Sequence, residues 1–191
     1  MTIMGTPNLI FLRHADTHKD PNMNAALWTL SEEGAKQAEE VVNLDVMQEV
    51  DVIYVSEHIK TSLTVEPLAK KLGQDVIPLA YFNEVKQGDA FLSPEEFAAE
   101  KVRQLQDLDY KAFGGGESGN EALARFQQGI EKISQDNDGK TVLIVTHGTV
   151  LNLYFADILD ARDQLPERWK KTGFCAYGVV EHGTVTKDII S

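Results

Sequence analysis

Two histidines in the sequence stand directly after short apolar runs, and one of them also follows an arginine. His14 comes after Asn8 to Leu12 and Arg13, and His147 comes after the apolar run 141–146. A neutral imidazole is a nucleophile toward phosphorus, and a neighbouring imidazole or guanidinium group stabilises the charge that develops during transfer. The planar fork of arginine bonds two phosphate oxygens at once. Taken alone, either histidine could be structural, so the argument depends on whether the two runs are neighbouring strands.

The apolar runs alternate with segments that carry helix-start and helix-stop signals. This alternation implies a mostly parallel central sheet with helices on both faces, in which ligands bind at the carboxyl ends of the strands. We therefore predict a single α/β domain over residues 1–191, with its site along one edge of the sheet. Strands are expected at 8–12, 51–55, 76–80 and 141–146, a hairpin at 176–181 and 184–189, and helices from Ser31, at 60–72, from Ser93, at 120–134 and from Gly148.

The composition limits which partners the chain can have. It has 191 residues, with 30 acidic and 18 basic side chains and a formal charge of −12. Such a charge should repel nucleic acid and anionic membranes, so a phosphate site must be a local basic pocket. The first residues lack the pattern of a signal peptide, and no apolar run approaches the ~20 residues of a membrane span. We expect no nucleic-acid or membrane partner and a cytoplasmic location.

A longer pattern surrounds the two histidines. The run Leu12-Arg13-His14-Ala15-Asp16-Thr17 resembles the Arg-His-Gly signature of the histidine phosphatase superfamily, also called phosphoglycerate-mutase-like. Further blocks resemble that family in the same order along the chain, at 30–38, 55–69, 82–84, 116–118 and 145–148. The order and spread of these blocks make the resemblance specific, and it implies the phosphoglycerate-mutase-like fold and a phosphatase of the small branch.

The resemblance also implies roles for particular residues. His14 would be the nucleophile that becomes phosphorylated, and Arg13 and His147 would line the phosphate pocket, with His147 also part of the catalytic set. Glu84 would protonate the leaving oxygen and then activate water. Lys60 stands where most members carry a second arginine, so it would bind phosphate without a bidentate fork. The family resemblance implies neither a metal nor another cofactor.

Three positions are less defined by the pattern. Thr17 lies where the family often has a side chain near the substrate, and Ser118 could contact substrate or cap a turn. Ala15 replaces the glycine of the signature, which would be costly if the backbone there needs positive φ.

Three other functions remain open on the sequence. A cofactor-dependent phosphoglycerate mutase shares the family, although this chain is short and its signature continues with Ala15-Asp16-Thr17. A non-catalytic phosphate-binding or regulatory module would fit the loss of arginine at Lys60. A metal hydrolase could use His14, Asp16, His18 and His147, although the charge of Arg13 would repel a cation at that place.

The substrate is expected to be a small phosphorylated molecule. The segment 91–116, between the acid and the glycine-rich turn, is expected to cover it. Lys101, Arg103 and Lys111 in this segment could meet a second anionic group or could form an ordinary solvated helix face. The sequence does not define the physiological substrate or the oligomeric state.

Overall fold

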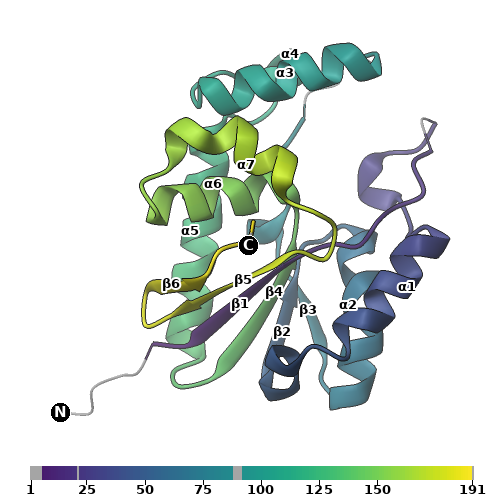
Figure 1. Cartoon of the computed structure of the whole chain (residues 1–191), viewed down its shortest axis with the longest axis vertical. Coiled ribbons are helices and arrows are strands. Elements are labelled where there is room, and N and C mark those ends of the chain that lie inside the picture. Colours follow the sequence, from purple (N-terminus) through teal and green to yellow (C-terminus); the bar gives the residue numbers. More distant parts are fainter. Residues whose placement is uncertain (1–5, 21, 88–91, 191) are drawn as a thin grey trace.

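The computed structural model describes residues 6–20, 22–87 and 92–190, which build a six-stranded sheet with helices on both sides (Figure 1). The strands lie in the order β3-β2-β4-β1-β5-β6. The first four run parallel, and β5 and β6 form an antiparallel hairpin at one edge. The mostly parallel sheet and the closing hairpin predicted from the sequence are therefore confirmed. The strands are β1 (Asn8–Arg13), β2 (Val52–Val55), β3 (Val76–Pro78), β4 (Thr141–Thr146), β5 (Tyr177–Glu181) and β6 (Thr184–Lys187).

Helices cover both faces of the sheet, as the alternating pattern predicts. In Figure 1, α1 and α2 lie on one face, α5, α6 and α7 lie on the other, and α3 and α4 form a layer beyond α7. Across the described ranges, no helix combines the length and apolar character needed to cross a membrane. The helices are α1 (Glu32–Val41), α2 (Ile59–Leu72), α3 (Pro94–Gln106), α4 (Ala112–Gly115), α5 (Gly119–Asp136), α6 (Gly148–Ile158) and α7 (Leu165–Lys171), and the shorter 3-10 turns are η1 (Ala25–Leu27), η2 (Asp45–Glu49), η3 (Ala80–Phe82) and η4 (Arg162–Gln164).

The sheet separates two apolar cores. Successive side chains of a strand point to opposite faces, so each central strand contributes to both cores. Phe11 of β1 joins the core under α5 and α6, whereas its neighbours Ile10 and Leu12 join the core under α1 and α2. Because both faces are covered, the central strands are apolar at nearly every position, which explains the continuous runs in the sequence.

Local signals place the helix ends near the expected positions. The Ser31 hydroxyl caps α1 by accepting from the amide of Gly34, and α2 ends at Gly73, which has the left-handed φ of 66°. The first part of the glycine run 114–116 belongs to the short turn α4. Phe113 anchors this turn, because its side chain is buried and its amide donates to the Glu100 carboxylate at 3.2 Å.

The loop after β1 is held tightly against α1. Gln37 accepts from the amide of Asp16 at 2.9 Å, and Ser31 donates to the Asp16 carboxylate at 2.7 Å. A Cβ atom at Gly34 would lie 2.0 Å from the carbonyl oxygen of Asp16, so this approach requires glycine. Ala15 is not among the described non-glycine residues with positive φ, and alanine is therefore tolerated in the signature.

The strand register brings the polar strand ends to one edge. Arg13 at the end of β1 lies opposite Thr146 at the end of β4, and Val55 at the end of β2 lies opposite Val145. His14, Ser56 and His147 are the first residues after β1, β2 and β4. Because β4 lies between β2 and β1 in the sheet, these three residues meet at its carboxyl end.

Candidate active site

His14 is a buried, neutral imidazole with one ring nitrogen already committed. Its Nδ1 lies 2.7 Å from the carbonyl oxygen of Ala15, and because a carbonyl only accepts, Nδ1 carries the proton. The other nitrogen, Nε2, then has a free lone pair. Burial, together with the charges of Lys60 and Arg13, lowers the pKa of His14 to about 3, so the ring stays neutral at neutral pH and Nε2 carries no proton. This is the state that a nucleophilic imidazole needs.

His147 packs beside His14, with ring centroids 5.2 Å apart. Its Nε2 lies 2.8 Å from the hydroxyl of the fully buried Ser56, which fixes the ring at the start of α6. Burial, with the nearby His14, His58 and cationic side chains, holds the pKa of His147 well below its ordinary value. The structure therefore places the two sequence-predicted histidines together, and both are neutral.

A third histidine joins the pair, and sequence reasoning missed it. The ring centroid of His58 lies 4.6 Å from that of His147. Its amide donates to Ser56, and its Nδ1 is buried with no partner in the described part of the chain. Burial and the Lys60 charge lower the pKa of His58. Its position two residues before Lys60, at a strand end, was the available signal.

Two cationic side chains flank the histidines. The Arg13 guanidinium donates to the carbonyl of Thr172 and lies over the ring of Phe174, 4.4 Å from its centroid. Arg13 Nε is buried and has no partner among the described atoms. Lys60 is 6% exposed; its Nζ donates to the Ala25 carbonyl at 2.8 Å, leaving two N–H groups for other acceptors. Burial leaves both cations poorly hydrated, and this lowers the pKa of each.

Trp28 lies over the lysine as a wall of the site. The Lys60 ammonium is 5.2 Å from the centroid of the Trp28 ring, and the indole donates to the carbonyl of Asp20 at 3.0 Å. The loop after β1 thus covers the lysine from one side.

The Glu84 carboxylate lies at the start of α6, next to the second histidine. Its Oε2 accepts from the amide of Thr149 at 3.1 Å, and its Oε1 accepts from the amides of Val150 at 3.2 Å and Val85 at 2.9 Å. Helix N-termini favour anions, and here the anion is a side chain of the protein itself. Burial alone would raise the pKa of Glu84, but Lys101 and these hydrogen bonds outweigh it and hold the pKa below the usual range.

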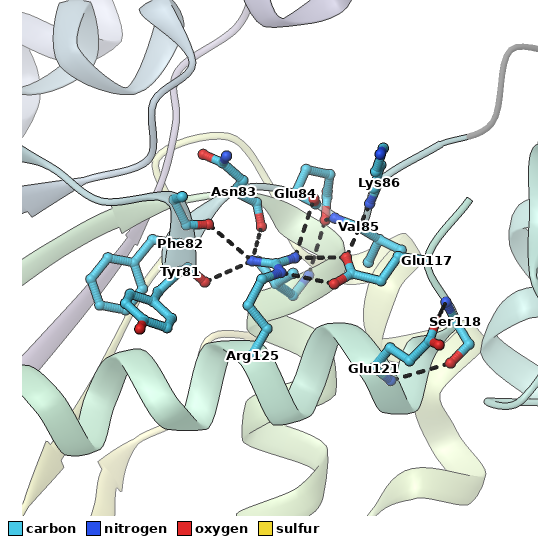
Figure 2. A network of polar contacts seen from close by, with 12 residues as sticks. Tyr81, Phe82, Asn83, Glu84, Val85, Lys86, Glu117, Ser118, Glu121 and Arg125 are labelled. Atoms are coloured by element: carbon cyan, nitrogen blue, oxygen red, sulfur yellow. Dashed lines mark hydrogen bonds and ion pairs between the residues drawn. The ribbon is translucent and has the colours of Figure 1, made fainter.

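The segment that carries Glu84 is clamped by an arginine that sequence reasoning did not single out (Figure 2). Arg125 of α5 donates to the carbonyls of Tyr81 at 2.7 Å and Asn83 at 3.0 Å. It also makes a two-pronged ion pair with Glu117, with both N···O distances 2.8 Å. Glu117 in turn donates its amide to the carbonyl of Lys86 at 2.8 Å, so both sides of Glu84 are fixed. The available signal for Arg125 was its place directly before the aromatic residue Phe126 in the predicted helix 120–134.

Ser118 and Thr17 have structural contacts of their own. The Ser118 hydroxyl accepts from the amide of Glu121, and the Glu121 carboxylate accepts from the amide of Ser118, which is a capping box for α5. The capping alternative for Ser118 therefore has direct support, and its contact with substrate stays a prediction. Thr17 is buried where its backbone bridges to Leu30, and its proximity to substrate also stays a prediction.

The cations of the covering segment are all engaged within the protein. Lys111 pairs with Glu121 at 2.7 Å, and the Arg103 guanidinium lies 3.8 Å from the ring centroid of Tyr110. Lys101 is 2% exposed and points inward to Thr149. Lys101 is therefore closed to a second anionic group, and the solvated-face alternative also fails for it, whereas Arg103 and Lys111 are exposed.

Of the four residues of the metal alternative, only His14 and His147 lie together. His18 is exposed, and the Asp16 carboxylate is bonded to Ser31. Within the ranges that the structure describes, no three His, Cys, Asp or Glu side chains are grouped to hold a metal ion.

The comparison with protein families identifies the superfamily. The model for the histidine phosphatase superfamily, branch 1, matches residues 9–189. The chain belongs to the histidine phosphatase superfamily. The match begins at the second residue of β1 and includes the rest of the sheet and all the site residues named above. No curated protein matches the sequence significantly.

Solved structures of this superfamily have the same fold at low sequence identity. Bacillus stearothermophilus YhfR superposes with a TM-score of 0.77 at 22% identity, covering 95% of each chain. A mycobacterial glucosyl-3-phosphoglycerate phosphatase gives 0.74 at 21%, covering 91% of this chain and 89% of its own. A phosphoserine phosphatase variant from Entamoeba histolytica, in complex with phosphoserine, gives 0.74 at 21%, covering 95% and 94%. These likenesses support the phosphoglycerate-mutase-like histidine phosphatase fold.

The Arg125 clamp generates a prediction about stability. Replacing Arg125 with Gln should lower the free energy of unfolding by about 2 kcal/mol, because Glu117 and several carbonyls lose a charged donor in a partly buried place. Amide exchange at Glu84 and Val85 should accelerate in the same variant. Arg162→Gln is the matched control, since that arginine pairs with Asp157 while half exposed. Equal stability and exchange in the Arg125 and Arg162 variants would contradict the clamp.

Proposed function

We propose that this histidine phosphatase superfamily member is a phosphomonoester phosphatase that works through a phosphohistidine on His14. The observation that carries the proposal is the state of His14: a neutral ring, its Nδ1 proton held by Ala15, between Arg13 and Lys60. The phosphatases among the structural neighbours support hydrolysis over the mutase alternative.

In the first step, Nε2 of His14 attacks phosphorus as the bond from phosphorus to the leaving oxygen breaks. The leaving oxygen takes a proton from the carboxyl group of Glu84, and the product alcohol departs. Arg13 and Lys60 hold the phosphoryl oxygens, and His147 and His58 add neutral imidazoles beside them. Phosphoryl transfer needs mainly positioning and charge stabilisation from the protein, which this set provides.

In the second step, water attacks phosphorus and the bond to His14 breaks. Glu84, now a carboxylate, accepts the proton of the attacking water. Inorganic phosphate leaves, and the imidazole returns to its neutral form. No metal ion takes part in either step, so the reaction should proceed in the presence of a chelator.

The depressed pKa of Glu84 sets a condition on the first step. A carboxylate must gain a proton before it can donate one, and here it is ionised when the site is free. A phosphate monoester has its second pKa at about 6, so at mildly acidic to neutral pH the substrate can bring this proton. We therefore expect the proton to be shared between bound phosphate and Glu84.

The expected substrate is a small phosphorylated metabolite. The described part of segment 91–116, residues 92–116, includes α3 and α4, lies against α7 and reaches the site through Thr149. We propose that this segment covers the substrate.

The primary test is hydrolysis of a chromogenic aryl phosphate with chelator present. Wild type should turn over, and His14→Ala should lose at least about 1000-fold in kcat/KM, because the nucleophile is gone. A phosphorylated intermediate, trapped from wild type by rapid acid-free quenching, should be acid-labile and absent from the variant. Turnover that survives His14→Ala would overturn the mechanism.

The role of Glu84 is tested with an alkyl phosphate, whose leaving oxygen needs a proton. Glu84→Gln should reduce kcat by about 100- to 10,000-fold, the usual contribution of a positioned acid or base. The inhibition constant for inorganic phosphate should change little in the same variant. Equal losses in turnover and in phosphate binding would show that another group is the acid.

Lys60 offers a test of the phosphate pocket. Lys60→Arg adds a second prong toward the phosphoryl group, and kcat/KM should rise about tenfold, as one more charge-assisted hydrogen bond of ~1.5 kcal/mol would give. Lys70→Arg, an exposed position on the same helix, serves as the control. An unchanged kcat/KM in a folded Lys60→Arg enzyme would contradict a limiting role for this geometry.

A further inference from the structure

Lys101 is a buried ammonium group without an ion-pair partner at contact distance. It is 2% exposed, and none of the ion pairs found among the described residues includes it. Its Nζ donates to Gln104 at 3.1 Å and to the hydroxyl of Thr149 at 3.3 Å. Neutral acceptors compensate only part of the desolvation of a charge, so this arrangement needs a nearby anion.

Two phenylalanines close the surroundings of this ammonium. Nζ lies 5.1 Å from the ring centroid of Phe113 and 6.0 Å from that of Phe97, and the two rings pack 5.0 Å apart. The aromatic faces favour a cation and exclude water. A substrate therefore has no open route to Lys101, and a direct role in anion binding does not fit.

The nearby anion is Glu84, and Thr149 joins the two groups. The amide of Thr149 donates to Oε2 of Glu84 at 3.1 Å, while its hydroxyl accepts from Lys101 at 3.3 Å. The same hydroxyl also contributes to lowering the pKa of Glu84. After burial, Lys101 is the largest influence on the pKa of Glu84, and Glu84 in turn opposes the effect of burial on the pKa of Lys101.

Other charged and titratable groups face Glu84 from several elements. Arg13 and His14 approach from the end of β1, His58 and Lys60 from the start of α2, and Arg125 of α5 lies against the Glu84 carbonyl. The histidines are neutral, and Arg125 is paired with Glu117. Arg13 and Lys60 would be engaged by a bound phosphoryl group, whereas Lys101 stays committed to Thr149.

We infer that Lys101 is the positioning residue of the catalytic carboxylate: through Thr149 it seats Glu84 at the start of α6, where Glu84 accepts the proton of the water that attacks phosphohistidine. This inference rests on the proposed function of Glu84. It assigns the covering segment a second task, because α3 then supplies the charge that prepares Glu84 to accept a proton from water.

If Lys101 positions Glu84 in this way, the hydrolysis of phosphohistidine is the step whose rate depends on Lys101. That step needs the carboxylate form of Glu84, which persists at lower pH when its pKa is depressed. Removing Lys101 raises the pKa of Glu84, so the rate of this step should begin to fall at a higher pH. With an aryl phosphate, whose leaving group needs no acid, kcat reports this second step.

The experiment compares Lys101→Met with wild type over a range of pH. The acidic limb of the kcat profile should move up by about one pH unit or more, as expected when an opposite charge is lost from a buried carboxylate. Arg103→Met is the matched control, because Arg103 is an exposed cation on the same helix, and its limb should stay in place. A folded Lys101→Met enzyme with an unmoved limb would overturn the inference.

A direct titration separates this inference from the proposed function. Carboxyl ¹³C signals of glutamate-labelled protein, with Glu84 assigned through Glu84→Gln, report its ionisation without any turnover. The midpoint should rise in Lys101→Met, and an unchanged midpoint would reject the coupling even in an active enzyme. If Lys101→Met does not fold, Thr149→Val, which keeps the amide and removes the hydroxyl, should raise the midpoint in the same direction, and no rise would again overturn it. Failure of the proposed function would instead appear as absent wild-type turnover.

Discussion

The site is organised around the charge of one carboxylate. Arg13, Lys60 and Lys101 are poorly hydrated cations, and the anion that acts on all three is Glu84. The amides at the start of α6 also donate to this carboxylate, so Glu84 is held by backbone and side chains together. If Glu84 moved, the three cations would lose their common partner. The position of the carboxylate therefore depends on β4, α3, α5 and α6 at once.

The same arrangement explains how a chain with a charge of −12 can offer a phosphate site. The site lies at the carboxyl ends of β1 and β4, where positive groups are buried and screened from the acidic surface. Positive charge in a low-dielectric place acts more strongly than the same charge in water. The neutral histidines add hydrogen-bonding capacity without adding further repulsion between cations.

Sequence alone predicted the parts of the site that follow strands. Strand ends in a parallel sheet share one edge, so Arg13, His14 and His147 could be placed together before the structure was known. The structure also places Lys60 and Glu84 near them, and the roles that the family resemblance implies for these residues stay predictions. Lys101 and Arg125 could not be placed in this way, because each lies on a helix whose inward face depends on packing between distant elements. His58 was missed because a single histidine at a loop gives no periodic pattern.

The ends of the covering segment are joined to each other as well as to the site. The Glu117 amide donates to the Lys86 carbonyl at 2.8 Å, and the Lys86 amide donates to the Glu117 carboxylate at 3.2 Å. The chain thus departs from the sheet and its covering helices after Lys86 and rejoins them at Glu117, at nearly the same point. A segment anchored in this way can gain or lose length at small entropic cost to the framework, because loop-closure entropy changes slowly with length. Evolution could therefore change the length and shape of this excursion and so diversify substrate choice, as long as α3 keeps the contact of Lys101 with Thr149.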